Sequence, residues 1–419
     1  MGVVRFSIIT AFPEYFDAFL NTSIVGRAVK EGKIEVEVLN LRDYAINSYG
    51  QVDDYSYGGG GMVIRPEPLH NALANVKSER SFVVYPSPQG VVLNQDMVEA
   101  LAAKDHVILV CGHYEGIDER FVEEYVDLEI SIGDYVLTGG ELPAMVIVDA
   151  VSRLVPGVVG REEAVLEDSF YRGMLDYPHY TRPSVWCGLE VPEELVSGDH
   201  ERAARWRRRQ AVARTLKRRP DLLARANIRP YLSQGVYVML VHHPVLNKDG
   251  DTATSAVTGL DLHDISRSCM TYGVNRFIVV TPLKSQQDMV RKIANHWEKA
   301  SIEGLNPMRS EALSLLKTFD SIENGLAWIE KKEKRKPLTV ATTAKKRAGA
   351  LPVFELKRML LEKDIPMCIL FGTSWGLTDE VFSKVDVVLN PILGGNGDYN
   401  HLSVRSAVAI LLDRLFGWR

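Results

Sequence analysis

The feature of this 419-residue sequence that most constrains its fold is a pattern that occurs twice along the chain. The segment LVCGHYEGIDERF (109–121) lines up with LFGTSWGLTDEVF (370–382) so that Gly112 matches Gly372, Gly116 matches Gly376 and Ile117 matches Leu377. In both places a Val-Asp pair follows, then a Gly-Gly pair, and then an apolar segment that ends on Arg-Leu. Glycine-tipped strands are common in α/β domains, so a chance likeness is the alternative. Similar spacing at four landmarks favours two copies of one ligand-binding architecture.

Short β-rich runs alternate with amphipathic segments in both halves of the chain. Helices are predicted over 93–103 and 144–154, and strands are predicted at VVRFSIIT, KIEVEVLNL, SFVVYPSP, HVILVCG, LEISIG, GVYVMLVHHPVL, RFIVVTP, LTVATT, MCILFGTS and VDVVLNP. This alternation is typical of an α/β fold with a parallel sheet and right-handed crossovers.

Changes in composition divide the chain into four predicted parts. Residues 1–160 are expected to form a first α/β domain, and the polar stretch 161–172 a linker. Residues 173–232 are expected to form a small, basic helical domain, and residues 233–419 a second α/β domain.

Composition also narrows the class of protein. Apolar residues make up 46% and charged residues 25% of the chain, which is normal for a globular protein. The four cysteines are far apart and form no C-x-x-C motif, so neither a zinc site nor a disulfide framework is expected. The N-terminus lacks the basic start of a signal peptide, and no apolar run reaches the roughly 20 residues that cross a bilayer. We expect a cytoplasmic protein without a membrane partner and without a metal cluster.

Positive charge is concentrated between His200 and Pro230. This segment holds eleven Arg and Lys residues against two acids, Glu201 and Asp221. A solvated helix face usually mixes both signs, so the bias favours a polyanion as partner over the simpler reading. Trp206 lies within the segment and could either stack on a ligand or pack in a core. The charged run at 330–337 is expected to be a solvated helix end.

The glycine-rich stretch SIGDYVLTGGELPAM, residues 131–145, raises the question of what its backbone approaches. Neither G-x-G-x-x-G nor G-x-x-x-x-G-K-[ST] is present, which argues against a nicotinamide dehydrogenase and a P-loop protein. Open α/β sheets bind ligands beyond the carboxyl ends of their strands. We therefore expect a nucleoside held there by backbone groups, with its ribose near Glu115.

An ordered set of motifs resembles one known family. The segments YSYGGGGM, YPSPQG, CGHYEGIDERF, SIGDYVLTGGELPAMVIVDAVSRLVPGVVG, EDSF, LDYPHYTRP and WRRRQ together resemble the bacterial tRNA (guanine-N1)-methyltransferases of the TrmD type, over about residues 1–230. The resemblance implies a SPOUT fold, in which the parallel sheet ends in a trefoil knot. It also implies a homodimer, a tRNA substrate and a possible need for magnesium.

The family's cofactor is S-adenosylmethionine, which the resemblance places in the glycine-rich loops. The residues that match its pocket are Tyr85, Pro86, Ser87, Pro88, Gly112, Tyr114, Glu115, Ile132, Gly133, Tyr135, Leu137, Gly139, Gly140 and Pro143. Most of these glycines could otherwise be explained as tight turns.

The reaction that the resemblance implies is methylation of N1 of the guanosine 3′ of the anticodon, position 37. Asp168 matches the family's general base, and Arg153 matches the arginine that steadies the guanine O6. Without the family, Asp168 would be interpreted as a capping or loop carboxylate, and Arg153 as a helix-end cation. The anticodon stem would be held through its phosphates by the basic segment, with candidate residues Arg205, Arg207, Arg208, Arg209, Lys217 and Arg218.

The second half, residues 235–419, also resembles SPOUT methyltransferases, most clearly at its C-terminal end. DLHDISRSCMTYGV resembles the first motif of the ribose 2′-O-methyltransferases, with Arg267 at the position of its arginine. Departures at Asp261, at Thr373-Ser374 and at LSVR (402–405) leave the reaction open. Arg267 could activate a hydroxyl or bind a phosphate, and the other candidate residues are Gly372, Gly376, Leu377, Leu393 and Leu402. The alternative is a non-catalytic RNA-binding or dimerisation module. His242, His243 and His401 are expected to be structural or hydrogen-bonding groups.

Overall fold

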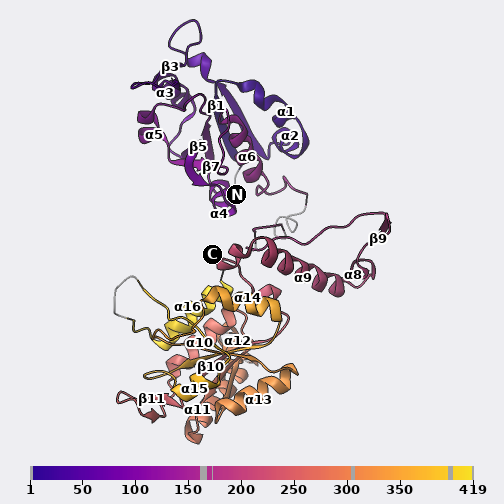
Figure 1. Cartoon of the computed structure of the whole chain (residues 1–419), viewed down its shortest axis with the longest axis vertical. Coiled ribbons are helices and arrows are strands. Elements are labelled where there is room, and N and C mark those ends of the chain that lie inside the picture. Colours follow the sequence, from indigo (N-terminus) through magenta and orange to yellow (C-terminus); the bar gives the residue numbers. More distant parts are fainter. Residues whose placement is uncertain (1–2, 161–167, 172, 303–306, 395–399, 418–419) are drawn as a thin grey trace. The chain divides into compact units, whose positions relative to one another are not determined.

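The computed structural model describes residues 3–160, 168–171, 173–302, 307–394 and 400–417. The chain forms two compact units, Met1–Tyr171 and Arg172–Arg419 (Figure 1). The expected linker at 161–172 lies mostly outside the described residues. The further division of the second unit near residue 232 stays a prediction.

The first unit is built on a five-stranded sheet in the order β2-β1-β6-β5-β7, and every pair in it is parallel. Its strands are β1 (Val4–Thr10), β2 (Ile34–Asn40), β5 (Ser81–Val92), β6 (His106–Val110) and β7 (Leu128–Ser131). A separate antiparallel hairpin consists of β3 (Asp53–Tyr55) and β4 (Met62–Ile64). The five predicted strands of this half are confirmed, and the hairpin was not predicted.

Helices cover both faces of this sheet. They are α1 (Asp17–Asn21), α2 (Ser23–Lys30), α3 (Pro66–Val76), α4 (Gln95–Ala102), α5 (Glu119–Tyr125) and α6 (Glu141–Ser152), with short 3-10 turns at Pro13–Phe16 and Leu41–Tyr44. The five residues of β6 are all buried, and they alternate between the two faces. Val107 and Leu109 pack with α2, α4 and α6, whereas Ile108 and Val110 pack with α3 and α5.

The second unit contains a six-stranded parallel sheet in the order β14-β13-β10-β16-β15-β17. Its strands are β10 (Val236–Val241), β13 (Arg276–Val280), β14 (Leu316–Phe319), β15 (Leu338–Ala341), β16 (Met367–Gly372) and β17 (Val387–Val388). A two-stranded hairpin consists of β11 (Val245–Leu246) and β12 (Thr252–Ala253). The strand β14 was not predicted.

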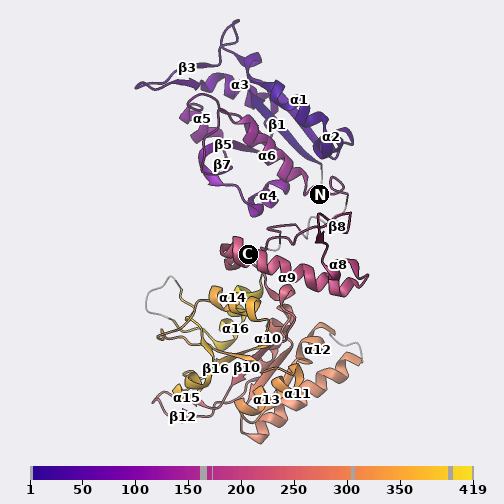
Figure 2. The same cartoon turned by 45° about the vertical axis from the view of Figure 1, so that its right-hand side comes forward.

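The helices of the second sheet are α10 (Gly259–Thr271), α11 (Lys284–Ile302), α12 (Pro307–Leu313), α13 (Ile322–Glu333), α14 (Val353–Lys363), α15 (Asp379–Lys384) and α16 (Val404–Phe416). The two views of the unit show these helices on both sides of the sheet (Figures 1 and 2). α13 and α15 pack on one face, and α10, α14 and α16 pack on the other. The run at 330–337 includes the exposed end of α13, as predicted.

The two sheets share their strand order. In the first sheet, the strand β6, where the repeated motif begins, lies between β1 and β5. In the second sheet, the corresponding strand β16 lies between β10 and β15. The last strand, β7 or β17, then pairs outside β5 or β15. The second sheet adds only β14 at its far edge. The prediction of two copies of one architecture is therefore confirmed at the level of sheet topology.

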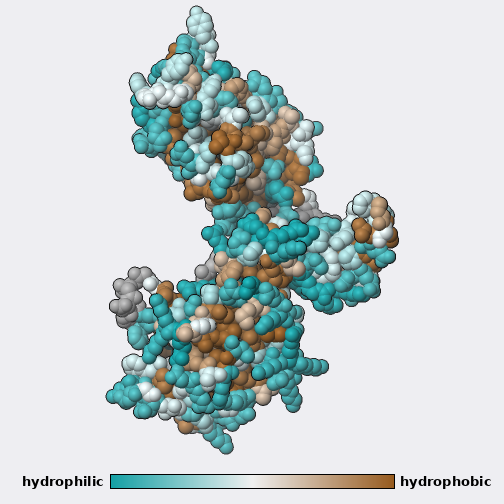
Figure 3. Space-filling model, in the orientation of Figure 1, coloured by the Kyte–Doolittle hydropathy of each residue, from teal (hydrophilic) through white to brown (hydrophobic). Residues whose placement is uncertain are grey.

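The part of the chain expected to be a basic helical domain, residues 173–232, is not wholly helical. It contains the hairpin β8 (Val185–Trp186) and β9 (Leu189–Glu190), the helices α8 (Glu193–Val196) and α9 (His200–Arg218), and 3-10 turns at Pro220–Ala224 and Arg229–Tyr231. The arginine-rich α9 region is hydrophilic in Figure 3, whereas hydrophobic residues gather at the tip of the hairpin. Trp206 packs, because it is only 5% exposed and meets Tyr180 edge-on.

The end of the basic segment shares a hydrophobic core with the second sheet. Leu223, Ala226 and Ile228 are fully buried in the same cluster as β10 and α16. The buried Lys357 on α14 donates hydrogen bonds from Nζ to the carbonyl oxygens of Leu223, at 3.0 Å, and Ala226, at 2.7 Å. A buried ammonium is costly unless its donors are satisfied, so these bonds fix the segment on the sheet.

Candidate functional site

Three segments meet at the carboxyl end of the first sheet, as predicted for the glycine-rich loops. The loop after β6 and the loop after β7 are joined by a bridge between His113 and Gly139. The amide of Gly140 donates a hydrogen bond of 2.8 Å to the carbonyl oxygen of Gly112. The third segment, the middle of β5 around Pro86, pairs with β7 at Ile130. Backbone from three parts of the sequence therefore forms one surface.

Close contacts surround the Gly139-Gly140 pair. A Cβ on Gly140 would lie 2.8 Å from the Cα of Cys111 and 2.9 Å from the amide nitrogen of Gly112. A Cβ on Gly139 would lie 2.3 Å from the carboxylate of Glu141. Neither glycine has a positive φ, so the left-handed backbone that favours glycine does not explain the pair. Proximity to backbone requires glycine at Gly140, whereas the atoms nearest to Gly139 belong to side chains.

Tyr85 lies under the loop that follows β6. A Cβ on Gly112 would approach the Tyr85 ring to 2.9 Å, and one on Gly116 would approach its hydroxyl to 3.2 Å. Burial, helped by the nearby Glu129 carboxylate, raises the pKa of Tyr85 to about 12. The side chain is therefore neutral at physiological pH and acts as a packing group with a hydroxyl at the loop.

The other predicted pocket residues border the same loops. Tyr135 folds back so that its ring would meet a Cβ on Gly133 at 2.6 Å, and Gly61 lies against the Glu115 carboxylate. Ser87 and Pro143 are buried, whereas Tyr114, Tyr135 and Leu137 are among the exposed side chains. Of the remaining members, Pro88 lies within β5, and Ile132 directly follows β7. The site thus has a buried backbone wall and an open rim of side chains.

One buried contact of this site was not predicted from the sequence. Glu141, the first residue of α6, is 3% exposed and accepts a 2.8 Å hydrogen bond from the hydroxyl of Thr10 at the end of β1. Thr10 in turn accepts a bond from the amide of Phe12. A carboxylate at a helix N-terminus is favoured by the helix dipole. The position of Glu141 directly after the Gly-Gly pair was the sequence signal that could have indicated this buried contact.

The two predicted catalytic residues are in direct contact. Arg153, which ends α6, donates a hydrogen bond from Nη2 to the carboxylate of Asp168. Both side chains are about half exposed, at 44% and 45%. Because an exposed ion pair contributes little stability, both groups can turn to a substrate at small cost.

The predicted RNA-binding residues on α9 differ in the contacts that they make. Arg205 and Arg209 pair with Glu201 and Glu194, at 3.4 and 3.1 Å. Arg207 lies over the ring of Tyr177. The others, Arg208, Lys217 and Arg218, are exposed, and they form no ion pair with any described carboxylate. Much of the positive charge on the helix is therefore available to a polyanion.

The second sheet ends in a similar loop. A Cβ on Gly372 would lie 2.6 Å from the amide nitrogen of Leu377, which is buried, and Gly376 has a φ of +103°. Leu393 and Leu402, by contrast, are about half exposed. Arg267 is exposed on α10, and the structure places no described carboxylate in an ion pair with it. Nearby on the same helix, Asp261 and Asp264 each lie 3.7 Å from Arg405.

A buried chain of hydrogen bonds lies where β10 and β16 end. The Thr373 hydroxyl donates to the carbonyl oxygen of Val241, so it accepts from Ser255 at 2.5 Å. Ser255 must then accept from Nδ1 of His242, at 2.8 Å. The proton is therefore on Nδ1, which leaves Nε2 of His242 as a buried acceptor for which the described residues supply no donor. His242 is a hydrogen-bonding group, as predicted.

Two further searches cover only the described residues. No group of three or more His, Cys, Asp or Glu side chains among them could hold a metal ion. In the same part of the chain, no helix is long and apolar enough to cross a membrane.

Comparisons with known proteins match both halves. Residues 4–225 match the family model described as tRNA (Guanine-1)-methyltransferase TrmD, and residues 235–417 match the model described as SAM-dependent RNA methyltransferase. A tRNA (guanine-N(1)-)-methyltransferase of Oleidesulfovibrio alaskensis is 40% identical over 99% of both chains, and so is one of Nitratidesulfovibrio vulgaris. The protein of the same name from Moorella thermoacetica is 56% identical over 54% of this chain and 93% of its own.

Proposed function

The chain belongs to the tRNA (guanine-N1)-methyltransferase family, and we propose that it methylates N1 of the guanosine 3′ of the anticodon, position 37. It carries a second SAM-dependent RNA methyltransferase domain in its C-terminal half. The contact between Arg153 and Asp168 is the observation that carries the proposal for the first half.

S-adenosylmethionine fits the glycine-lined surface. The loops around Gly112 and Gly140 offer backbone amides and carbonyls without intervening side chains, and the buried Nδ1 of His113 has no partner among the described residues. Such groups suit a nucleoside that is recognised by its edges. When bound, the cofactor supplies an electrophilic methyl group, and Tyr85, Gly112, Glu115, Gly133 and Gly140 would hold it.

Asp168 acts as the general base in this proposal. N1 of guanine carries a proton and is a poor nucleophile until that proton leaves. The proton passes to a carboxylate oxygen of Asp168 as N1 gains the methyl group. Arg153 gives up its contact with Asp168, and its guanidinium then stabilises the negative charge that develops on O6. The mutual contact in the structure keeps both groups at one place until the guanine separates them.

A homodimer is part of the proposal for the first unit. Leu142 and Val146, one turn apart on α6, are 49% and 44% exposed, and hydrophobic residues gather on the face of the unit over which α6 lies (Figure 3). A second copy would cover this face and place its own residues near the loops of the first. We also propose the trefoil knot of the family, for which the position of β6 between β1 and β5 is the support, and a cytoplasmic location, where tRNA is modified.

Nucleoside mass spectrometry tests the proposal. Unmodified tRNA with guanosine at position 37 is incubated with S-adenosylmethionine and the full chain, and a tRNA with adenosine at that position serves as control. We expect 1-methylguanosine only from the first tRNA. Its absence would overturn the proposal, and a product from both would exclude position 37. An unchanged rate after chelation would show that the magnesium expected from the resemblance is not needed.

For the second half we propose methyl transfer to an RNA, with Gly372, Gly376 and Leu377 in the cofactor loop and Arg267 at the RNA. The shared strand order and the tight loop at Gly372 support this. The alternative, a non-catalytic RNA-binding or dimerisation module, is favoured if Asp168→Asn abolishes 1-methylguanosine and no other methylated nucleoside is found with any RNA supplied.

A further inference from the structure

A cavity of about 520 Å³ lies in the second unit, bordered by residues 177–184, the end of the β8–β9 hairpin, α8 and α9. Its lining has two chemically different parts. Val191, Leu195 and Val196 supply apolar surface, and Arg182 and Arg207 supply two guanidinium groups. The lining contains no carboxylate. The volume lies within the roughly 300–1,000 Å³ range of small-molecule sites.

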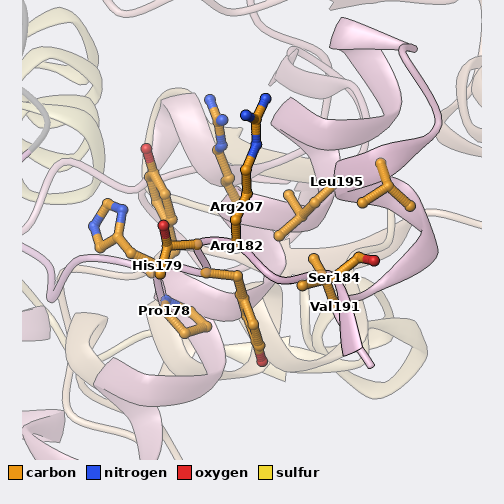
Figure 4. Close-up of a pocket in the computed structure, with 11 residues that line it drawn as sticks. Pro178, His179, Arg182, Ser184, Val191, Leu195 and Arg207 are labelled. Atoms are coloured by element: carbon orange, nitrogen blue, oxygen red, sulfur yellow. The ribbon is translucent and has the colours of Figure 1, made fainter. Parts of the chain in front are cut away.

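The two arginines are arranged for an anion. In Figure 4 their guanidinium groups lie next to each other and point the same way, with His179 to one side and Val191 and Leu195 to the other. Within the described part of the chain no carboxylate forms an ion pair with either of them. Other arginines of α9 are neutralised, Arg202 by Glu193 at 3.2 Å and Arg209 by Glu194 at 3.1 Å. Adjacent guanidinium groups without an acid match the bidentate geometry of phosphate.

Aromatic contacts orient one of the two arginines. The Arg207 guanidinium lies 5.2 Å from the centroid of the Tyr177 ring, so it is oriented without being neutralised. Tyr177 meets His179 at 4.7 Å, and Nε2 of His179 is fixed by the Asp176 carboxylate at 2.7 Å. Arg207 is therefore preorganised, which reduces the entropy that binding costs.

We propose that this cavity holds one unpaired nucleotide of the tRNA, with a phosphate between Arg182 and Arg207 and the base against Val191 and Leu195. The inference rests on the proposed tRNA methyltransferase function and adds a subsite to it. A nucleotide combines a flat, largely apolar base with a phosphate, which matches the two parts of the lining. Since bases inside a duplex cannot enter a cavity, the nucleotide must come from a loop or a bulge.

The experiment measures tRNA binding by the full chain over a series of salt concentrations. Arg182→Gln removes one phosphate contact, so we expect Kd to rise about 5- to 10-fold and the slope of log K against log salt to fall by about 1. Leu195→Trp fills the base position without changing charge, and we expect a similar rise in Kd at an unchanged slope. Arg291→Gln is the matched control, because this exposed arginine pairs with Asp288 outside the cavity, and it should leave both values unchanged.

Methylation assays with the same proteins separate this inference from the proposed function. If the wild-type chain forms 1-methylguanosine and both cavity variants raise KM at a retained kcat, the proposed function and the nucleotide subsite are both supported. If the wild type is active and the cavity variants keep its KM, Kd and salt slope, the cavity does not take RNA and serves another partner, such as a protein segment. A wild type without activity that still loses tRNA affinity in both variants would sink the proposed reaction alone. Circular dichroism of each variant checks that it is folded.

Discussion

Arg153 at the end of α6 donates a hydrogen bond to the carboxylate of Asp168, fifteen positions later in the chain. The contact unites two residues that the family resemblance singles out for different tasks, one to take a proton and one to stabilise an oxyanion. Because both side chains are about half exposed, the pair is a resting arrangement and not a buried structural bridge.

Asp168→Asn is expected to lower the rate of 1-methylguanosine formation by roughly 100-fold or more, since the amide keeps the shape but cannot accept the N1 proton. The Kd for S-adenosylmethionine, measured by calorimetry, should change less than about 2-fold because Asp168 does not line the glycine loops. Glu123→Gln, at an exposed carboxylate on α5, is the matched control. Equal loss of cofactor binding and activity would mean that Asp168 is structural.

Gly140→Ala tests the glycine-lined surface. The new methyl group would lie 2.8 Å from backbone of Cys111 and 2.9 Å from backbone of Gly112, which cannot move without opening the two loops. We expect cofactor affinity to fall by about 10-fold or more, with a loss of stability of about 1–3 kcal/mol, as is common for overpacking.

Gly160→Ala is the control for this variant, because a Cβ there meets no atom of the described residues within 4 Å. Calorimetry with S-adenosylmethionine and thermal unfolding are the measurements. Wild-type affinity in Gly140→Ala would show that the cofactor does not bind at these loops.

The sequence allowed the α/β class and ten strands to be predicted because buried parallel strands are continuous apolar runs. The start of α6 was placed at residue 144, whereas the helix begins at Glu141. The acid Glu141 at the first position of the helix does not fit an apolar pattern. It is buried because its carboxylate accepts a hydrogen bond from Thr10 on a distant strand. β14 was missed because its four residues, LKTF, alternate too briefly to show a period.

The contacts within the candidate site could likewise be predicted only in part from the sequence. Motif order could indicate that Gly139 and Gly140 approach something, yet only the fold identifies Gly112 and Cys111 as their neighbours. The cavity beside Arg207 was not predicted, because Arg182 and Leu195 come from separate segments, and the sequence does not show that they meet. Contacts between distant segments depend on topology, which local patterns do not encode.

Gly372→Ala tests cofactor binding by the second half. A Cβ at this position would lie 2.6 Å from the amide nitrogen of Leu377, whereas a Cβ on Gly394, the control position, meets no atom within 4 Å in the described part of the chain. If both halves bind S-adenosylmethionine, calorimetry should give two sites per wild-type chain, one in Gly372→Ala and two in Gly394→Ala. A wild-type stoichiometry of one, unchanged in Gly372→Ala, would favour the non-catalytic module.

His242 gives the second unit a characteristic dependence on pH. Burial lowers the pKa of this imidazole to about 4, from 6.5. As the pH falls from about 7 to 4, the unfolded chain takes up a proton that the folded chain does not, so the free energy of unfolding falls. At about 1.4 kcal/mol for each unit, the loss attributable to His242 is roughly 3 kcal/mol, fully developed only below the folded pKa.

His242→Asn removes the titration but keeps a donor for Ser255, since the amide nitrogen of asparagine can replace Nδ1. All six tryptophans lie at or beyond Trp186, so tryptophan fluorescence during urea unfolding follows the second unit and not the first. The stability of the wild type relative to His242→Asn should decrease steadily between pH 7 and pH 4.5. A difference that does not vary with pH would show that the imidazole can be protonated in the folded state. In that case Nε2 would take up the second proton, while Nδ1 would still donate to Ser255 and the direction of the chain to Thr373 would be unchanged.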